Sequence, residues 1–181
     1  ISGNAFKKIH KLENGSVQLT VCSPPYNMSK EYKKNLDISD YIAPYANFIK
    51  GLYDATSDTG SVCWQVGNYV QNGQLIPLDY LFYPLFIDAG FQLRNRIIWT
   101  FGHGLHSSRR LSGRYATILW WSKSAKYHFD LDNIRVESKY PGKRAYKGPN
   151  KGKPSGNPRG KNPSDYWKDV VINDWETEIW D

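Results

Sequence analysis

The segment from Thr20 to Asn27 constrains the fold of this chain more than any other. It reads Thr-Val-Cys-Ser-Pro-Pro-Tyr-Asn, and its first part belongs to a hydrophobic run, residues 17–22, that predicts a β-strand. Each proline fixes its own φ at about −65°, lacks an N–H and keeps the preceding residue out of the α region. We therefore expect a rigid extended step, Ser23 to Tyr26, at the carboxyl end of a strand, where open α/β sheets bind their ligands.

Such a step suits a planar molecule that carries an amino group. Hydroxyl and backbone carbonyl oxygens can accept hydrogen bonds from the amine while the Tyr26 ring stacks on the plane. A nucleobase turned out of its duplex is a molecule of this kind. For the Pro-Pro-Tyr triplet taken alone, a strand end followed by a core aromatic is the alternative.

Helix and strand patterns alternate along the first two thirds of the chain. A short helix is expected after Asn4, with longer helices at 38–56 and 77–89, the second ended by Gly90. Further strands are expected at 61–67, 91–101 and 115–122, and the polar residues 28–37 are expected to form a loop. This alternation predicts crossover units, a mostly parallel sheet and an α/β fold.

The net charge of +7 is concentrated near the carboxyl end. Residues 139–168 hold nine basic residues against the single acid Asp165, and residues 139–164 are rich in proline and glycine. A segment so poor in apolar side chains cannot build a core, so we expect it to be disordered or ordered only against a partner. A solvated linker is one interpretation. The interleaving of Tyr140, Arg144 and Tyr146 favours contacts with nucleic acid phosphates and bases.

Composition excludes several classes of protein. No apolar run approaches the about 20 residues that span a membrane, and no signal peptide opens the chain. The two cysteines, Cys22 and Cys63, lie in apolar strands without metal-ligand spacing, so we expect reduced thiols, no metal site and a cytoplasmic protein.

The ordered motifs resemble one known family. Thr-x-x-Ser-Pro-Pro-Tyr-Asn is similar to motif IV of the S-adenosylmethionine-dependent DNA amino-methyltransferases, which methylate cytosine N4 or adenine N6. Weaker similarities follow the order of the β class of these enzymes: residues 1–4, 60–68, 96–99 and 114–123, the last resembling motif VIII. Relatives carry an aspartate where this chain has Asn4, and often a glutamate at Ala116.

The resemblance implies a set of site residues. It assigns catalysis to Ser23, Pro24, Pro25 and Tyr26. It assigns cofactor contacts to Asn4, Cys22 and Ser23, and the base pocket to Asn27, Trp99 and Trp120. For each tryptophan alone, including Trp121, a core position is the alternative. DNA contacts are expected from the basic segment: Lys139, Lys143, Arg144, Lys147, Arg159 and Lys161.

The resemblance also implies a part that this chain does not contain. The family binds S-adenosylmethionine through a Phe-x-Gly-x-Gly loop, and no such string occurs in these 181 residues. We therefore expect a fragment. Residues 1–130 would be a catalytic α/β region, part of a Rossmann-like class I methyltransferase sheet with helices on both faces. Residues 131–181 would be a basic, irregular target-recognition segment and a linker to the cofactor-binding part.

Two classes of function remain open at the level of sequence. The first is a DNA amino-methyltransferase acting on double-stranded DNA, with Ser23 favouring cytosine N4 over adenine N6. Its further partners are expected to be a second copy of the chain or a restriction endonuclease acting on the same site. The second is a DNA-binding module without catalysis.

Overall fold

The computed structural model describes residues 2–27, 36–102, 104 and 106–168. They belong to two compact units. The sheet unit comprises residues 1–127 and 165–181, and the basic lobe comprises His128–Ser164. Much of the expected loop at 28–37 and of the expected linker after residue 168 lies outside the described residues.

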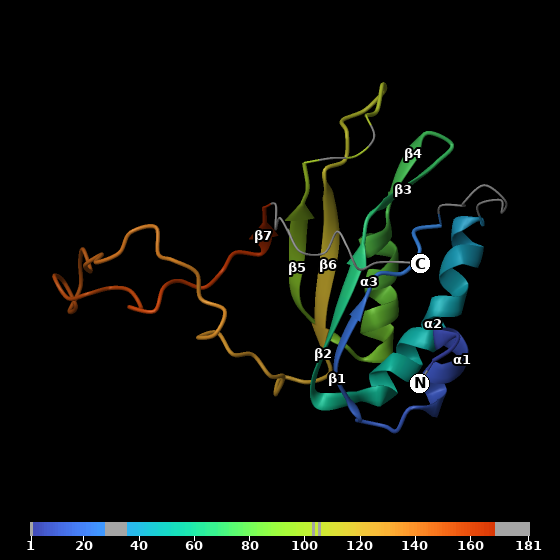
Figure 1. The fold of residues 1–181 in the computed structure, drawn as a ribbon, viewed down its shortest axis with the longest axis horizontal. Coiled ribbons are helices and arrows are strands. Elements are labelled where there is room, and N and C mark those ends of the chain that lie inside the picture. The colour runs from blue at the N-terminus through green and yellow to red at the C-terminus, as the bar shows by residue number, and fades with distance from the viewer. Residues whose placement is uncertain (1, 28–35, 103, 105, 169–181) are drawn as a thin grey trace. The chain divides into compact units, whose positions relative to one another are not determined.

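The sheet unit is built on a mixed sheet in which one strand is reversed (Figure 1). β1 and β2 are parallel, β6 is antiparallel to both β2 and β5, and β5 is parallel to β7. Four strands therefore point the same way, as the alternating pattern predicts. The strands, in their spatial order, are β1 (Val17–Cys22), β2 (Thr56–Val66), β6 (Tyr115–Ser122), β5 (Gln92–Thr100) and β7 (Tyr166–Trp167).

The helices begin and end close to where the sequence predicts. The short α1 (Ala5–Lys8) is capped by Asn4, whose Oδ1 accepts from the Lys7 N–H at 3.3 Å, and a 3-10 turn, Ile9–Lys11, follows. α2 spans Ile38–Ala55, and α3 spans Leu78–Ala89 and ends at Gly90, which takes a φ of +103°. No helix among the described residues is long and apolar enough to cross a membrane.

α2 and α3 cover the same face of the sheet, whereas helices are expected on both faces (Figure 1). The Trp64 ring of β2 lies 6.0 Å from Tyr45 of α2 and 5.3 Å from Phe86 of α3, centroid to centroid. The connections β1–α2–β2 and β2–α3–β5 progress across the sheet in one direction, and right-handed crossovers then place both helices on one side. On the other face, Leu19 and Val21 of β1 remain 60% and 73% exposed.

Aromatic side chains fill the core between the helices and the sheet. Trp64, Phe82, Phe86 and Trp121 are fully buried, and the ring of Trp121 stacks on Phe86 at 4.7 Å. The core alternative for Trp121 is thereby confirmed.

A β-hairpin that the pattern analysis missed follows β2. β3 (Asn68–Gln71) and β4 (Gln74–Pro77) pair antiparallel around Asn72 and Gly73, which have φ values of +52° and +77°. Asn-Gly is the strongest short-range hairpin signal because both central residues of the turn require positive φ. This signal was present in the sequence.

An ion pair between a buried aspartate and a half-exposed arginine joins α3 to β5. Asp79, which is 7% exposed, accepts from Nη2 of Arg96 at 2.6 Å and from Nε at 2.7 Å. Asp79→Asn should lower the free energy of unfolding by about 1–2 kcal/mol, since hydrogen bonds to charged groups are strong but half of Arg96 is exposed. Chemical denaturation measures the change. Asp88→Asn, on the exposed side of the same helix, is the control, and equal stabilities of the two variants would contradict the prediction.

The basic lobe is ordered by backbone bonds rather than by a core, which differs from the expected disorder or dependence on a partner. Val136 and Lys161 exchange two N–H to carbonyl bonds, of 3.0 and 2.9 Å, and the Ser155 N–H donates to the Lys143 carbonyl at 2.8 Å. Tight turns close the intervening segments, with positive φ at Gly142, Gly148 and Gly152. Beyond the lobe, the chain returns to the sheet as β7.

Candidate active site

The Ser-Pro-Pro-Tyr step lies at the carboxyl end of β1, as the sequence predicts. Cys22 pairs with Trp64 in the parallel β1–β2 ladder, so the ends of both strands reach the same edge of the sheet. Ser23 and Pro25 are exposed, Pro24 is buried and Tyr26 is half-buried. The step thus presents a hydroxyl to solvent at the edge where α/β proteins bind ligands.

Tyr26 lies directly against the backbone at the end of β2. A β-carbon placed on Gly67 would lie 3.0 Å from Cε2 and 3.4 Å from Cδ2 of Tyr26. Glycine permits this close approach because it has no side chain. The ring is also packed against the aromatic core. Its position is therefore fixed by β2 as well as by the two prolines.

A hydroxyl from α2 fixes the backbone of the step. The Tyr41 hydroxyl donates to the Pro25 carbonyl at 2.7 Å. The sequence pattern predicted a helix over residues 38–56 but not this contact. No signal in the sequence identifies it, because it depends on how α2 packs beside β1.

The titratable groups near the step are held in their neutral forms. Burial raises the pKa of Tyr26, and a hydrogen bond with the Ser23 side chain lowers it in part. Burial raises the pKa of the Cys22 thiol and of the Tyr41 and Tyr45 hydroxyls as well. At neutral pH the site therefore offers neutral hydrogen-bonding groups rather than a thiolate nucleophile or a tyrosinate base.

Asn27 lies beside the step with its amide engaged. Its Nδ2 donates to the Leu36 carbonyl at 2.8 Å, its Oδ1 accepts from the Leu36 N–H at 3.2 Å, and its φ is +58°. These bonds join the two ends of the segment 28–35, which lies outside the described residues. Asn27 thereby defines where the chain leaves the site and where it returns.

The two tryptophans expected in the base pocket lie on other strands. Trp99 pairs with Ala116 at the end of β5, beyond β2 and β6 in the sheet order from β1, and its ring is 6.5 Å from that of Phe101. Trp120 pairs with Cys63, and its ring lies 5.4 Å from that of Tyr127. Cys63 also pairs with Val21 of β1, so Val21, Cys63 and Trp120 lie in one row across the sheet. This row is on the face opposite the helices.

The expected cofactor contacts have different surroundings. Asn4 is exposed and uses Oδ1 to cap α1, and Cys22 is a half-buried thiol packed against the core. Of these residues, Ser23 presents an exposed hydroxyl at the strand end.

The basic residues expected to bind DNA all lie in the lobe and are exposed. The lobe has a cavity of about 560 Å³, which Lys143 and Arg159 line together with Ser138 and Asn157. The Arg144 guanidinium donates to the Gly152 carbonyl at 2.7 Å. Cations thus gather on a unit that has almost no apolar interior. The full set is Lys139, Lys143, Arg144, Lys147, Arg159 and Lys161.

Comparison with known proteins decides the family. The DNA methylase family model matches residues 17–179, which include the step, the sheet and the lobe. The chain belongs to the DNA methylase family. One relative, the Type II methyltransferase M.BglII of Bacillus subtilis, is 42% identical over 167 residues, which are 92% of this chain and 46% of that protein.

Solved structures show the fold of this DNA methylase chain. It superposes on PvuII DNA methyltransferase, described as cytosine-N4-specific, with a TM-score of 0.60 at 21% identity, over 73% of this chain and 51% of that one. It also superposes on a Thermus thermophilus protein solved with S-adenosyl-L-methionine, with a TM-score of 0.57 at 22% identity, over 77% of this chain and 58% of that one. The fold is thus the Rossmann-like fold of class I methyltransferases. The chain spans about half the length of the curated relative it matches.

Proposed function

We propose that the protein to which this chain belongs transfers a methyl group from S-adenosylmethionine to the exocyclic amine of a flipped base in double-stranded DNA. The observation that carries the proposal is the Ser23–Tyr26 step at the sheet edge, with an exposed hydroxyl and an aromatic ring fixed by Gly67. Membership of the DNA methylase family supports the same reaction.

The residues of the step would act by positioning. An exocyclic amine is a weak nucleophile because its lone pair is delocalised into the ring. Hydrogen bonds from its two N–H groups to the Ser23 hydroxyl and the Pro24 carbonyl would favour a pyramidal nitrogen whose lone pair is available. Tyr26 would stack on the base and recover part of the unstacking energy, a few kcal/mol. Catalysis of this kind rests on orientation and on preorganised dipoles.

The neutral groups of the site agree with direct transfer. The raised pKa values of Tyr26 and Cys22 disfavour a charged base or a thiolate at neutral pH. The amine would therefore take the methyl group by direct displacement, without a covalent bond to the enzyme, and S-adenosylhomocysteine and one amine proton would be released. Tyr41 would support the reaction indirectly, by holding the Pro25 carbonyl and with it the backbone of the step.

S-adenosylmethionine would bind at this edge. Ser23 would contact it, the family resemblance adds contacts from Cys22 and Asn4, and the cofactor would supply the activated methyl group. The remaining walls would come from a cofactor-binding part of the protein. Two features support its packing here: β1 is the edge strand of the described sheet, and Leu19 and Val21 are exposed on the open face. Exposed apolar edge strands in native proteins are normally covered.

For the target base we propose cytosine N4, with adenine N6 as the second candidate. Ser23 supports this assignment through the family resemblance, in which serine at this position is commoner among cytosine enzymes. A hydroxyl accepts from either amine, so the size of the pocket would select the base. Mass spectrometry of digested, methylated DNA would distinguish N4-methylcytosine from N6-methyladenine.

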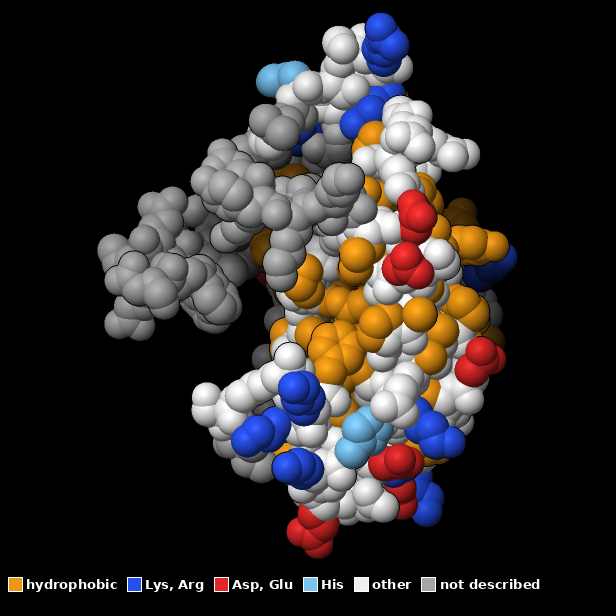
Figure 2. All heavy atoms as spheres, turned by 90° about the vertical axis from the view of Figure 1, so that its right-hand side faces the viewer, with side chains coloured by type: hydrophobic (Ala, Val, Ile, Leu, Met, Phe, Trp, Pro, Cys, Tyr) orange, Lys and Arg blue, Asp and Glu red, His pale blue; other side chains and the backbone are white. Residues whose placement is uncertain are grey.

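The basic lobe would bind the duplex, and further partners belong to the same proposal. A second copy of the chain is supported by hydrophobic side chains that gather over α1 and α2 (Figure 2). Phe6 of α1 is 40% exposed although its ring packs 4.9 Å from that of Phe48. Apolar surface of this kind marks interfaces. A restriction endonuclease acting on the same site would be the other partner, and the cytoplasm the compartment.

The decisive experiment is methyl transfer by the protein expressed from its complete coding sequence. Labelled S-adenosylmethionine and unmethylated duplex DNA should yield labelled DNA, and no product should form on DNA already methylated in vivo by the same protein. Salt-dependent DNA binding with neither transfer nor cofactor binding would instead favour a DNA-binding module without catalysis.

A further inference from the structure

The basic lobe keeps its shape almost without a hydrophobic interior. Gly160 is the one buried residue between His128 and Ser164, and Tyr140 and Tyr146 are 65% and 89% exposed. Hydrophobic stabilisation scales with the apolar area removed from water, so it contributes little here. Polar contacts must therefore fix the side chains of this unit.

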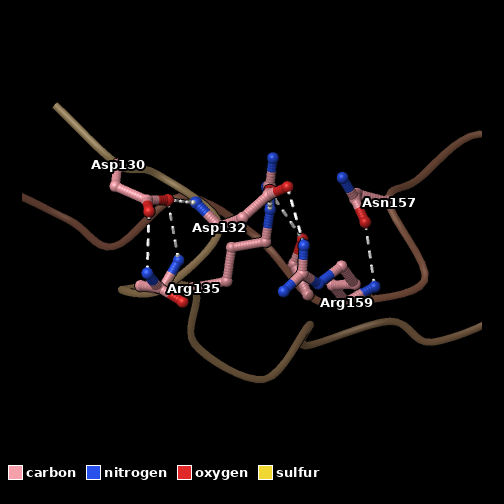
Figure 3. Close-up of polar contacts among 7 residues, drawn as sticks. Asp130, Asp132, Arg135, Asn157 and Arg159 are labelled. Atoms are coloured by element: carbon pink, nitrogen blue, oxygen red, sulfur yellow. Dashed lines mark hydrogen bonds and ion pairs between the residues drawn. The ribbon is translucent and has the colours of Figure 1, made fainter.

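Asp132 bridges two parts of the lobe that are distant in the sequence (Figure 3). Its Oδ1 accepts from Nε of Arg135 at 2.6 Å, and its Oδ2 accepts from Nη1 of Arg159, 27 residues away, at 2.8 Å. The two arginines hold the pKa of Asp132 below its usual value. Hydrogen bonds between charged groups at these distances are about twice as strong as neutral ones.

Local bonds fix both ends of the bridge. Asp130 Oδ1 accepts from the N–H groups of Asp132 and Asn133, at 3.1 and 3.3 Å, and Asn157 Oδ1 accepts from the Arg159 N–H at 2.9 Å. Short polar side chains that bind the backbone a few residues ahead are typical of tight turns. The bridge therefore joins two ordered turns rather than two free side chains.

Arg159 keeps donors for a further partner. Its side chain is 60% exposed, and its bond to Asp132 uses Nη1. A guanidinium carries five N–H donors in a planar fork. A fork held in one orientation matches the edge of guanine, whose O6 and N7 accept together, whereas a lysine on a flexible stem suits phosphates.

We propose that Asp132 is a positioning residue, which holds Arg159 in the orientation needed to contact a base edge in the DNA target. The inference rests on the proposed function, because it requires that the lobe binds DNA. Arg159 and the lysines would then have different roles in DNA binding. The oriented Arg159 contacts base edges and so recognises sequence, and the surrounding lysines contact phosphates independently of sequence.

The direction in which one substitution changes DNA affinity distinguishes this positioning role from simple electrostatics. Asp132→Asn removes a negative charge from a surface that meets a polyanion, so electrostatics alone predicts tighter DNA binding. Loss of positioning predicts weaker binding to the target. Glu137→Gln removes an exposed carboxylate from the same lobe and serves as the matched control for charge.

The experiment compares two duplexes with the protein expressed from its complete coding sequence. One contains the target, located by sequencing the DNA that the protein methylates. The other has the same composition in shuffled order. Fluorescence anisotropy should show that Asp132→Asn and Arg159→Ala each weaken target binding about tenfold, a typical effect for one base contact. Binding to the shuffled duplex should change only through charge: slightly tighter for Asp132→Asn, as for Glu137→Gln, and slightly weaker for Arg159→Ala. The double variant should bind no more weakly than Arg159→Ala.

Several results would overturn the proposal. Asp132→Asn could bind the target as tightly as Glu137→Gln, or could bind both duplexes more weakly by the same factor. In the double variant, the loss of affinity from Asp132→Asn could also add in full to the loss from Arg159→Ala. Loss of amide protection at Val136 and Lys161 in Asp132→Asn would show that Asp132 holds the fold of the lobe instead. If the wild type binds DNA but methylates none, the proposed function fails, and a target selected from random duplexes keeps the comparison of variants valid.

Discussion

Replacing Tyr26 with alanine should lower kcat/KM for DNA methylation by about 100-fold or more. The ring is held by Gly67 and by the core, so it offers a preformed stacking surface at the end of β1. Stacking of a base on an aromatic side chain contributes about 1–3 kcal/mol, and misplacement of the amine adds to that loss. Steady-state transfer of labelled methyl groups to duplex DNA measures the effect.

Two further variants show whether the ring itself is responsible. Tyr26→Phe keeps the ring and removes the hydroxyl that bonds with Ser23, so it should retain most of the activity. Tyr80→Ala removes an exposed tyrosine of α3, 75% accessible, and should leave transfer unchanged. Undiminished transfer by Tyr26→Ala in a folded protein would remove the step from the catalytic machinery.

Local patterns were sufficient to predict most elements of the sheet unit. The strands Val17–Cys22 and Tyr115–Ser122 begin and end at the expected residues, and α2 differs from its prediction by one residue at its end. These segments have strong periodicity and clear ends. The reversed direction of β6 could not be read in this way, because it depends on which strands become neighbours.

Contacts between distant residues explain the rest of what the sequence could not show. The Tyr41 hydroxyl reaches the Pro25 carbonyl only because α2 packs beside β1, and Asp79 meets Arg96 only once α3 lies on the sheet. The composition of the lobe predicted a unit without a core. It could not predict the bridge from Asp132 to Arg159, because these residues are far apart in the sequence.

Replacing Gly160 with alanine should disrupt the basic lobe and weaken DNA binding by about tenfold or more. Gly160 has a φ of +108°, which costs a residue with a side chain about 1–2 kcal/mol, and an added β-carbon would overlap the Val136 carbonyl oxygen. That oxygen accepts from the Lys161 N–H, so relief of the overlap breaks the bonds between Val136 and Lys161. A unit without a core has little hydrophobic stabilisation to offset the loss.

Hydrogen exchange tests the structural cause separately from DNA binding. In Gly160→Ala the Val136 and Lys161 amides should lose protection while the amides of β2 and β6 keep it, because the lobe and the sheet unit are separate compact units. Gly156→Ala is the matched control, because Gly156 and Gly160 line the same cavity of the lobe and no atom lies within 4 Å of a β-carbon added at Gly156. This variant should bind DNA as the wild type does. Equal DNA affinity of the two variants would show that the shape of the lobe does not determine binding.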